Sequence, residues 1–173
     1  MPQIAETAIA TVPSPARGVA PVSAPVRLRI PVIGVDASVG TVTTNRDGAL
    51  EPPASDTAVG WWPKSPSPGM LGAAVIVGHL DSRTGPAVFA GLSMLTPGDS
   101  MSIQRADGST AVFRIRHLVV FTKSDFPTAE VYGHTANAQL RLITCGGAYD
   151  RVAQTYLGNL VVFADLVSTG SVP

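Results

Sequence analysis

Two residues of this sequence have side chains suited to covalent catalysis, and each ends a short apolar segment. Cys145, the only cysteine of the chain, follows residues 140–144, and His79 follows residues 73–78. A cysteine thiolate attacks carbonyl carbons, and a nearby imidazole carries protons to and from the reacting groups. Glycines next to both residues leave room for a substrate to approach the backbone. The pair predicts thiol-dependent acyl chemistry, provided that the fold brings together residues 66 positions apart.

The elements that must position this pair are short apolar runs separated by turn signals. Two segments of strand character, 101–104 and 110–115, flank Asp107-Gly108, which is the pattern of a β-hairpin. Helix is sparse, and we expect only a turn or two at residues 53–59 and 87–92. The sequence therefore predicts a mostly β fold, a barrel or a sandwich. The apolar runs are residues 28–30, 39–42, 73–80, 101–104, 112–120, 140–144 and 160–166.

Composition divides the chain into one domain and two flanking segments. Residues 1–25 contain five prolines and no periodic pattern, which predicts a flexible Pro/Ala-rich linker. Residues 26–168 form the predicted catalytic domain, and residues 169–173 form a C-terminal tail. We also expect no membrane span and no signal peptide within this sequence, because it lacks a run of 18 apolar residues and a charged, then apolar, start.

Charge and cysteine content exclude several classes of function. Lys plus Arg and Asp plus Glu number 12 each, so the chain has no basic surplus for binding nucleic acid. A single cysteine excludes an internal disulfide and a multi-cysteine metal site. Acidic residues near 124–132 are isolated, so we expect no required metal and no cofactor.

The segments around the two reactive residues resemble one enzyme family. Gly78-His79-Leu80-Asp81, together with Leu-Ile-Thr-Cys ending at Cys145, resembles the sortase pattern of a histidine after one strand and a cysteine ending another. The sequence segments 85–89, 95–99 and 144–150 resemble those of the actinobacterial class F branch, or class E/F-like sortases. The resemblance spans residues 26–167 and implies a single-domain, eight-stranded sortase-type β-barrel with short helices.

The resemblance also implies a reaction and its partners. The expected enzyme is a cysteine transpeptidase that cleaves a Leu-Pro-x-Thr-Gly-like sorting signal between Thr and Gly. Cys145 would attack the Thr carbonyl, and His79 would protonate the leaving amine and deprotonate the incoming one. The acyl group would pass to an amine of the cell wall or of a pilin. The implied protein is a monomer that acts outside the cytoplasm, at the surface of a Gram-positive cell.

Secondary roles at this site are open. Thr144 is a candidate for lining the substrate groove, although a β-branched residue in a strand needs no further reason. Asp81 either orients His79 or caps the following turn.

The sequence departs from the family at its catalytic arginine, which the resemblance places on the strand after the cysteine. Leu157 and Asn159 occupy that stretch. Arg151, six residues after Cys145, is the nearest alternative, and we expect it to supply the cation, with Asn159 as a fallback donor. Arg141 lies roughly 13 Å from the thiol along a strand, which is too far.

Two other functions compete with this interpretation. An L,D-transpeptidase is another cell-wall cysteine enzyme, but it would place His and Gly directly before the cysteine, where this chain has Ile143-Thr144. The missing strand arginine would instead suit a non-catalytic β-domain for surface adhesion or assembly. Alkylation of the thiol separates these cases, because an inert, buried cysteine reacts only in denaturant.

Overall fold

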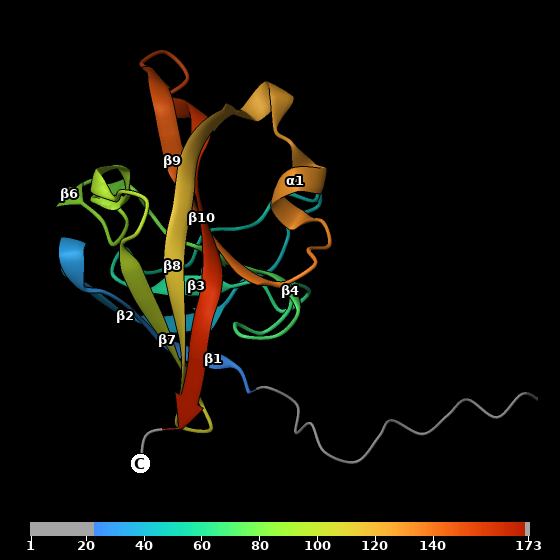
Figure 1. The fold of residues 1–173 in the computed structure, drawn as a ribbon. Coiled ribbons are helices and arrows are strands. Elements are labelled where there is room, and N and C mark those ends of the chain that lie inside the picture. Colours follow the sequence, from blue (N-terminus) through green and yellow to red (C-terminus); the bar gives the residue numbers. More distant parts are fainter. Residues whose placement is uncertain (1–22, 172–173) are drawn as a thin grey trace, which may run out of the picture.

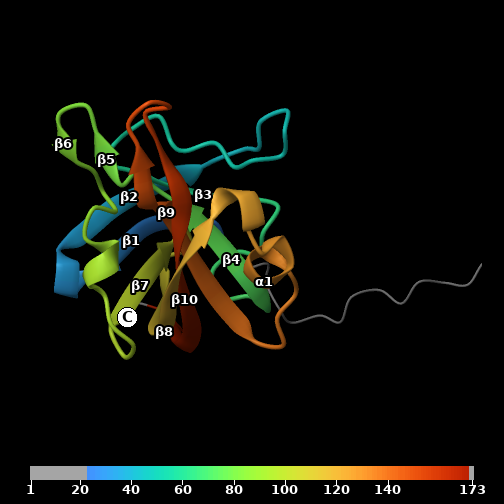
Figure 2. The ribbon, with the colours of Figure 1, turned by 90° about the horizontal axis from the view of Figure 1, so that it is seen from above.

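A closed β-barrel dominates the computed structural model, which describes residues 23–171 (Figure 1). Eight strands close the barrel in the order β1-β2-β3-β4-β9-β10-β8-β7. Figure 2 shows these strands arranged around the barrel from above. The barrel strands are β1 (Pro25–Ile30), β2 (Val35–Thr41), β3 (Val59–Trp61), β4 (Gly72–Val77), β7 (Ser100–Arg105), β8 (Ser109–Thr122), β9 (Ala138–Asp150) and β10 (Thr155–Ser171).

The remaining elements are short. Strands β5 (Asp81–Ser82) and β6 (Gly85–Pro86) form a separate two-stranded hairpin directly after β4. The helix α1 (Thr128–Tyr132) lies between β8 and β9. Single 3₁₀ turns occur at Pro31–Ile33, Leu92–Met94 and Lys123–Asp125. No helix in the described part of the chain is long and apolar enough to cross a membrane.

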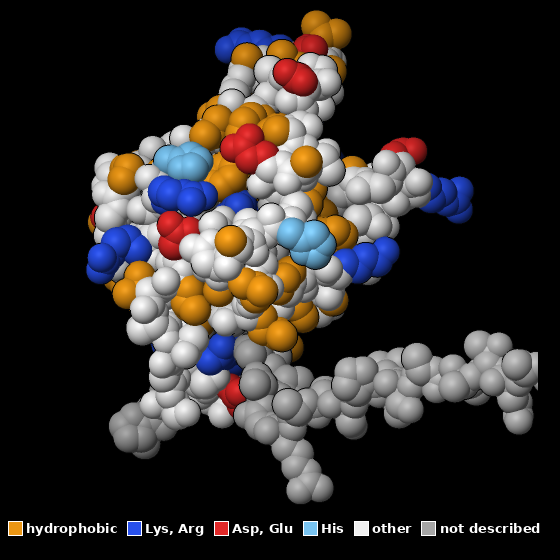
Figure 3. All heavy atoms as spheres, turned by 45° about the vertical axis from the view of Figure 1, so that its right-hand side comes forward, with side chains coloured by type: hydrophobic (Ala, Val, Ile, Leu, Met, Phe, Trp, Pro, Cys, Tyr) orange, Lys and Arg blue, Asp and Glu red, His pale blue; other side chains and the backbone are white. Residues whose placement is uncertain are grey.

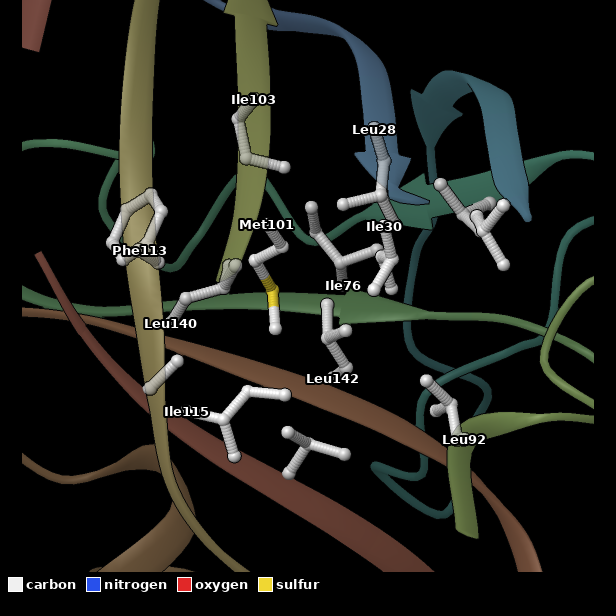
Figure 4. Packing of buried hydrophobic residues seen from close by; sticks show 14 of the residues in the cluster. Leu28, Ile30, Ile76, Leu92, Met101, Ile103, Phe113, Ile115, Leu140 and Leu142 are labelled. Carbon is white, nitrogen blue, oxygen red and sulfur yellow. The ribbon is translucent and has the colours of Figure 1, made fainter. Parts of the chain in front are cut away.

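Alternate residues of the strands fill the inside of the barrel. Leu28 and Ile30 from β1 meet Ile76 from β4 and Leu142 from β9, and all four are fully buried (Figure 4). Period-2 alternation produces this result, because successive side chains of a strand point to opposite faces. Burying each such side chain contributes about 1.5–3 kcal/mol. This packing holds β4 and β9, the strands that lead to His79 and Cys145, in a fixed register.

A second apolar cluster covers the outer face of β4, β9 and β10. The cluster contains Val77, Ile143 and Phe163 from the three strands, and Val131 of α1 packs with them. Arg141 lies at the same face with 2% of its surface exposed, and its guanidinium sits 4.4 Å from the centre of the Phe163 ring. Burial lowers the pKa of Arg141 to about 10. This arginine therefore belongs to the wall of the barrel.

The structure confirms the predicted mostly β, eight-stranded barrel and the hairpin around Asp107-Gly108, which is β7–β8. The helix expected at residues 53–59 is wrong, because this segment is a bent loop leading into β3. Of the helix expected at 87–92, only turns and the adjoining 3₁₀ turn Leu92–Met94 form. The helix α1 was missed, since five residues are too few for a 3.6-residue period.

The ends of the barrel differ slightly from the sequence-based boundaries. Most of the linker predicted at residues 1–25 lies outside the described residues. Its last part belongs to the barrel, because the Ser23 carbonyl accepts a hydrogen bond from Ser67 and β1 starts at Pro25. Strand β10 continues to Ser171, so most of the stretch predicted as a tail from 169 onward is strand.

Candidate active site

The parallel ladder between β4 and β9 leads His79 and Cys145 to the same end of the sheet. Val77 is paired with Ile143, and the Gly78 amide extends the ladder by donating to the Ile143 carbonyl at 3.1 Å. Continued by two residues, this register would set His79 alongside Cys145. Neighbouring strands lie about 4.8 Å apart. The two candidate residues therefore follow the same end of neighbouring strands, although 66 residues of chain separate them.

Asn159 flanks Cys145 on the opposite side. Strand β10 is antiparallel to β9, and Asn159 is the direct cross-strand partner of Cys145. Such partners share a face of the sheet, with Cβ atoms about 4.5–5.5 Å apart. Asn159 and Cys145 are both half-buried. Cys145 and Asn159 thus share a face of β9 and β10, while His79 lies two residues past the end of β4, the strand on the other side of β9.

The backbone, rather than a carboxylate, orients the imidazole. His79 Nε2 lies 2.7 Å from the Pro53 carbonyl oxygen. A carbonyl only accepts, so Nε2 carries the hydrogen, and Nδ1 is left for proton exchange in the neutral ring. Of the two roles considered for Asp81, orienting His79 is not seen. Asp81 Oδ2 instead accepts a 2.6 Å hydrogen bond from the Tyr156 hydroxyl.

A β-bulge shapes the chain just beyond Cys145. Gly146 pairs with Gly158 and Tyr149 pairs with Tyr156, so β9 holds one more residue than β10 between these pairs. Gly147 has a φ of +77°, which suits the left-handed residue of such a bulge. At Gly158 a Cβ atom would come within 2.6 Å of the Phe121 carbonyl oxygen. These glycines therefore permit the bend and the close strand packing beside the thiol.

A pocket of about 540 Å³ opens beside Cys145 between two hairpins. The rings of Tyr149 and Tyr156 meet edge to face, with centroids 4.9 Å apart. The hydrogen bond to Asp81 raises the pKa of Tyr156 above its ordinary value. The residues that line the pocket are Asp81, Ser82, Arg83, Cys145, Tyr149, Gln154, Thr155 and Tyr156.

The other predicted site residues lie further from this pocket. Thr144 is 3% exposed and does not line it, and its hydroxyl has no hydrogen-bond partner among the described residues. Arg151 is exposed in the turn that joins β9 to β10. This hairpin stands clear of the barrel at the top of Figures 1 and 3. The preceding residue, Asp150, is five residues from Cys145, about 16 Å along an extended strand. The structure thus places Asn159, and not Arg151, next to the thiol.

Of the eight lining residues, sequence reasoning named only Asp81 and Cys145, and it missed six, among them Arg83, Tyr149 and Tyr156. Arg83 follows His79 by four positions and lies in the turn of the β5–β6 hairpin. The two strands of this hairpin are too short to be recognised from sequence alternation. Among residues 23–171, no group of three or more His, Cys, Asp or Glu side chains is arranged to hold a metal ion.

The family model of the sortase domain matches residues 28–167, most of the 173-residue chain. The chain therefore belongs to the sortase family, a family of cysteine transpeptidases. The L,D-transpeptidase alternative has no support from this match. A comparison with curated proteins gave no match.

Solved sortase structures share the fold. Sortase C-1 from Actinomyces oris aligns with a TM-score of 0.64 at 22% identity, over 87% of this chain and 76% of its own. Sortase A from Corynebacterium diphtheriae aligns with a TM-score of 0.64 at 23% identity, over 88% of this chain and 63% of its own. Sortase A from Listeria monocytogenes aligns with a TM-score of 0.65 at 15% identity, over 89% and 92%.

Proposed function

We propose that this sortase cleaves a Leu-Pro-x-Thr-Gly-like sorting signal between Thr and Gly and transfers the acyl group to an amine. The arrangement of Cys145 opposite Asn159 on β9 and β10, with His79 two residues past the end of the neighbouring β4, carries this proposal. It sets a nucleophile between a proton carrier and a hydrogen-bond donor, which is the arrangement that acyl transfer through a thioester requires.

The roles follow from the chemistry of each side chain. The Cys145 thiolate attacks the Thr carbonyl, and the tetrahedral intermediate collapses as the C–N bond breaks. The His79 imidazolium gives a proton to the departing Gly amine, which leaves a thioester and a neutral imidazole. The same imidazole then takes a proton from the incoming amine, whose attack on the thioester forms the new amide and frees the thiolate.

Asn159 is the donor that we propose for the oxyanion of the tetrahedral intermediate. The side-chain amide of Asn159 carries two N–H donors. Because Asn159 is the cross-strand partner of Cys145, these donors would lie close to the carbonyl group that the thiolate attacks. Arg151 remains the sequence-based alternative, and it would have to reach back from the exposed turn. Thr144 and Asp81 are proposed to support substrate binding, Thr144 from beneath the thiol and Asp81 from the pocket wall.

The biological setting follows from family resemblance. We propose that the enzyme acts as a monomer at the surface of a Gram-positive cell, without cofactor or required metal. Its partners would be surface proteins that bear a sorting signal, with an amine of the cell wall or a pilin lysine as acceptor. The sequence segments 85–89, 95–99 and 144–150 favour the class F branch.

One experiment tests the activity and defines the signal. The full chain is incubated with a library of Leu-Pro-x-Thr-Gly-like peptides, and intact-protein mass spectrometry follows the enzyme. A sortase gains the mass of the acyl fragment that ends in Thr and releases a peptide that begins with Gly. Intact peptides and an unmodified enzyme across the library would contradict the proposal.

A second candidate rests on the absence of arginine next to Cys145. A sortase fold with Asn159 in place of the strand cation suits a non-catalytic domain for surface adhesion or assembly. Such a domain would form no acyl-enzyme with any peptide of the library, although Cys145 would still be alkylated in denaturant.

A further inference from the structure

The pocket beside Cys145 contains a cation that the steps above do not use. Arg83 lines the pocket from the β5–β6 hairpin, while Cys145, Tyr149 and Tyr156 line it from β9 and β10. Its volume of about 540 Å³ lies within the range of small-molecule sites. A substrate group that entered this pocket would meet the thiol and the guanidinium together.

Hydrogen bonds fix the turn that carries Arg83. Ser82 and Gly85 pair across the hairpin, and the Ser82 hydroxyl donates to the Gly85 carbonyl at 3.1 Å. The Thr84 amide donates to the same hydroxyl oxygen at 3.3 Å. The base of the hairpin is also tied, because the Phe89 amide donates to the His79 carbonyl at 2.9 Å. Arg83 is therefore presented by a defined turn that starts from the catalytic histidine.

The charge of Arg83 is available to a ligand. The neighbouring carboxylate, Asp81, accepts the hydrogen bond from Tyr156 at 2.6 Å. Among the residues that the structure describes, the ion pairs involve Arg27, Arg29 and Arg116, and none involves Arg83. A guanidinium presents a planar fork of N–H donors that matches a carboxylate. An anionic group on a reactant would therefore find an unengaged partner beside the thiol.

The lining indicates which reactant occupies the pocket. Five of the eight lining residues have charged, aliphatic hydroxyl or amide side chains, and the Leu and Pro side chains of a sorting signal would meet only the rings of Tyr149 and Tyr156 as larger apolar surface. The acyl part of the substrate therefore lies elsewhere, and the pocket belongs to the amine side of the scissile bond. The leaving amine and the attacking amine occupy the same side of the acyl-enzyme, since attack of an amine on the thioester is the chemical reverse of the step that forms it.

We propose that Arg83 binds a carboxylate on the amine-side reactant, either the incoming acceptor or the segment that follows the scissile bond. This inference rests on the proposed transpeptidation at Cys145. Arg83 is then a specificity-determining residue, which favours amines that carry an anionic group close to the reacting nitrogen.

The first arm of the test compares two acceptors. The full chain is acylated with a sorting-signal peptide and offered glycylglycine or its C-terminal amide, which differ by one charge. The ratio of transfer to hydrolysis is measured by mass spectrometry. Wild type should prefer the carboxylate by about tenfold, equivalent to about 1.4 kcal/mol, and Arg83→Ala should lose this preference. Arg83→Lys should keep part of it, because an ammonium retains the charge and loses the fork.

A matched control uses Arg114, which is exposed on β8 and is the direct cross-strand partner of Asp165 on β10. Asp165 is also paired with Gln139, six residues along β9 from Cys145. Arg114→Ala removes a cation far from the pocket, so acceptor preference should stay as in wild type.

The second arm compares peptides with Glu or Gln directly after the scissile Thr-Gly bond, and the rate of acyl-enzyme formation is measured. A preference for Glu that Arg83→Ala removes assigns the carboxylate to the leaving segment. If Arg83→Ala removes the charge preference only among the dipeptide acceptors, the carboxylate belongs to the acceptor.

Either result supports the inference. The inference is overturned if, in both arms, wild type shows no preference for the carboxylate or Arg83→Ala keeps the same preference as wild type. Acyl-enzyme formation without charge preference overturns this inference alone, while the absence of any acyl-enzyme overturns the proposed function as well.

Discussion

The imidazole of His79 is held by the Pro53 carbonyl at 2.7 Å, which leaves the other ring nitrogen for the reacting groups. His79→Ala should lower the rate of peptide cleavage at least about a hundredfold, the lower range for positioned acid–base catalysis. Steady-state cleavage of a sorting peptide measures the loss. His134, exposed in a loop, is the control, and His134→Ala should cleave like wild type. A loss of only a few-fold in His79→Ala would reduce His79 to a scaffold residue.

The oxyanion donor is the residue-scale question that the missing arginine raises. Asn159→Ala removes the side chain opposite Cys145 and should lower turnover about a hundredfold to a thousandfold, or about 3–4 kcal/mol. Comparison with Arg151→Ala under the same conditions decides between the two donors. A large loss in Arg151→Ala with full activity in Asn159→Ala would show that the hairpin turn reaches back to the thiol.

Residue types and spacing made Cys145 and His79 candidates, and the resemblance of the segments around them to sortases turned the candidates into a prediction. Residue types and spacing could not rank Asn159 above Arg151. That ranking depends on the cross-strand register, which the bulge at Gly147 shifts by one residue. Arg83 was missed for a similar reason, since its position depends on how a two-residue hairpin turn folds toward β9.

At the scale of elements, one hydrogen bond links the β5–β6 hairpin to the β9–β10 hairpin. Tyr156 donates to Asp81, and this bond raises the pKa of Tyr156. A raised pKa in the folded state means that the bond stabilises the protonated phenol. The contribution is complete below the ordinary tyrosine pKa of about 10 and is lost as pH rises through the raised value.

An ultraviolet titration of tyrosinate tests this link. Wild type should show two tyrosines that ionise late, Tyr156 through its hydrogen bond and Tyr132 through burial. Tyr156→Phe should lose one late component and keep that of Tyr132. An unchanged late component in Tyr156→Phe would mean that the two hairpins are not joined in solution.

The elements themselves were predictable where the sequence alternates or marks its turns. The β7–β8 hairpin followed from Asp107-Gly108 between two strand-like runs. The turn of helix expected at 53–59 failed because its backbone bonds elsewhere: the Asp56 carbonyl accepts from Val88 and the Pro53 carbonyl contacts His79. Those contacts are tertiary, and no local pattern encodes them.

At the scale of the whole molecule, the start of the barrel can be located by truncation. The Ser23 hydroxyl accepts from the Asp107 amide at 2.9 Å, and the Ala24 carbonyl accepts from the Ala106 amide at 2.9 Å. Deleting residues 1–22 should leave peptide cleavage and thermal unfolding unchanged. Deleting residues 1–25 should lower the free energy of unfolding by about 1 kcal/mol for each lost hydrogen bond. A large loss of cleavage in the shorter deletion would mean that the N-terminal segment takes part in substrate binding.

Cys145 as the nucleophile is the central claim, and the barrel, the strand register and the pocket all bear on it. The most direct measurement is tandem mass spectrometry of the enzyme trapped with a sorting peptide, in wild type and in Cys145→Ala. We expect an acyl fragment ending in Thr, attached to Cys145 as a thioester that hydroxylamine releases, and no adduct and no cleavage in Cys145→Ala. The variant should unfold like wild type, since a half-buried thiol at the rim loses little on truncation. An acyl group on another residue, or peptide cleavage that persists in Cys145→Ala, would contradict the account.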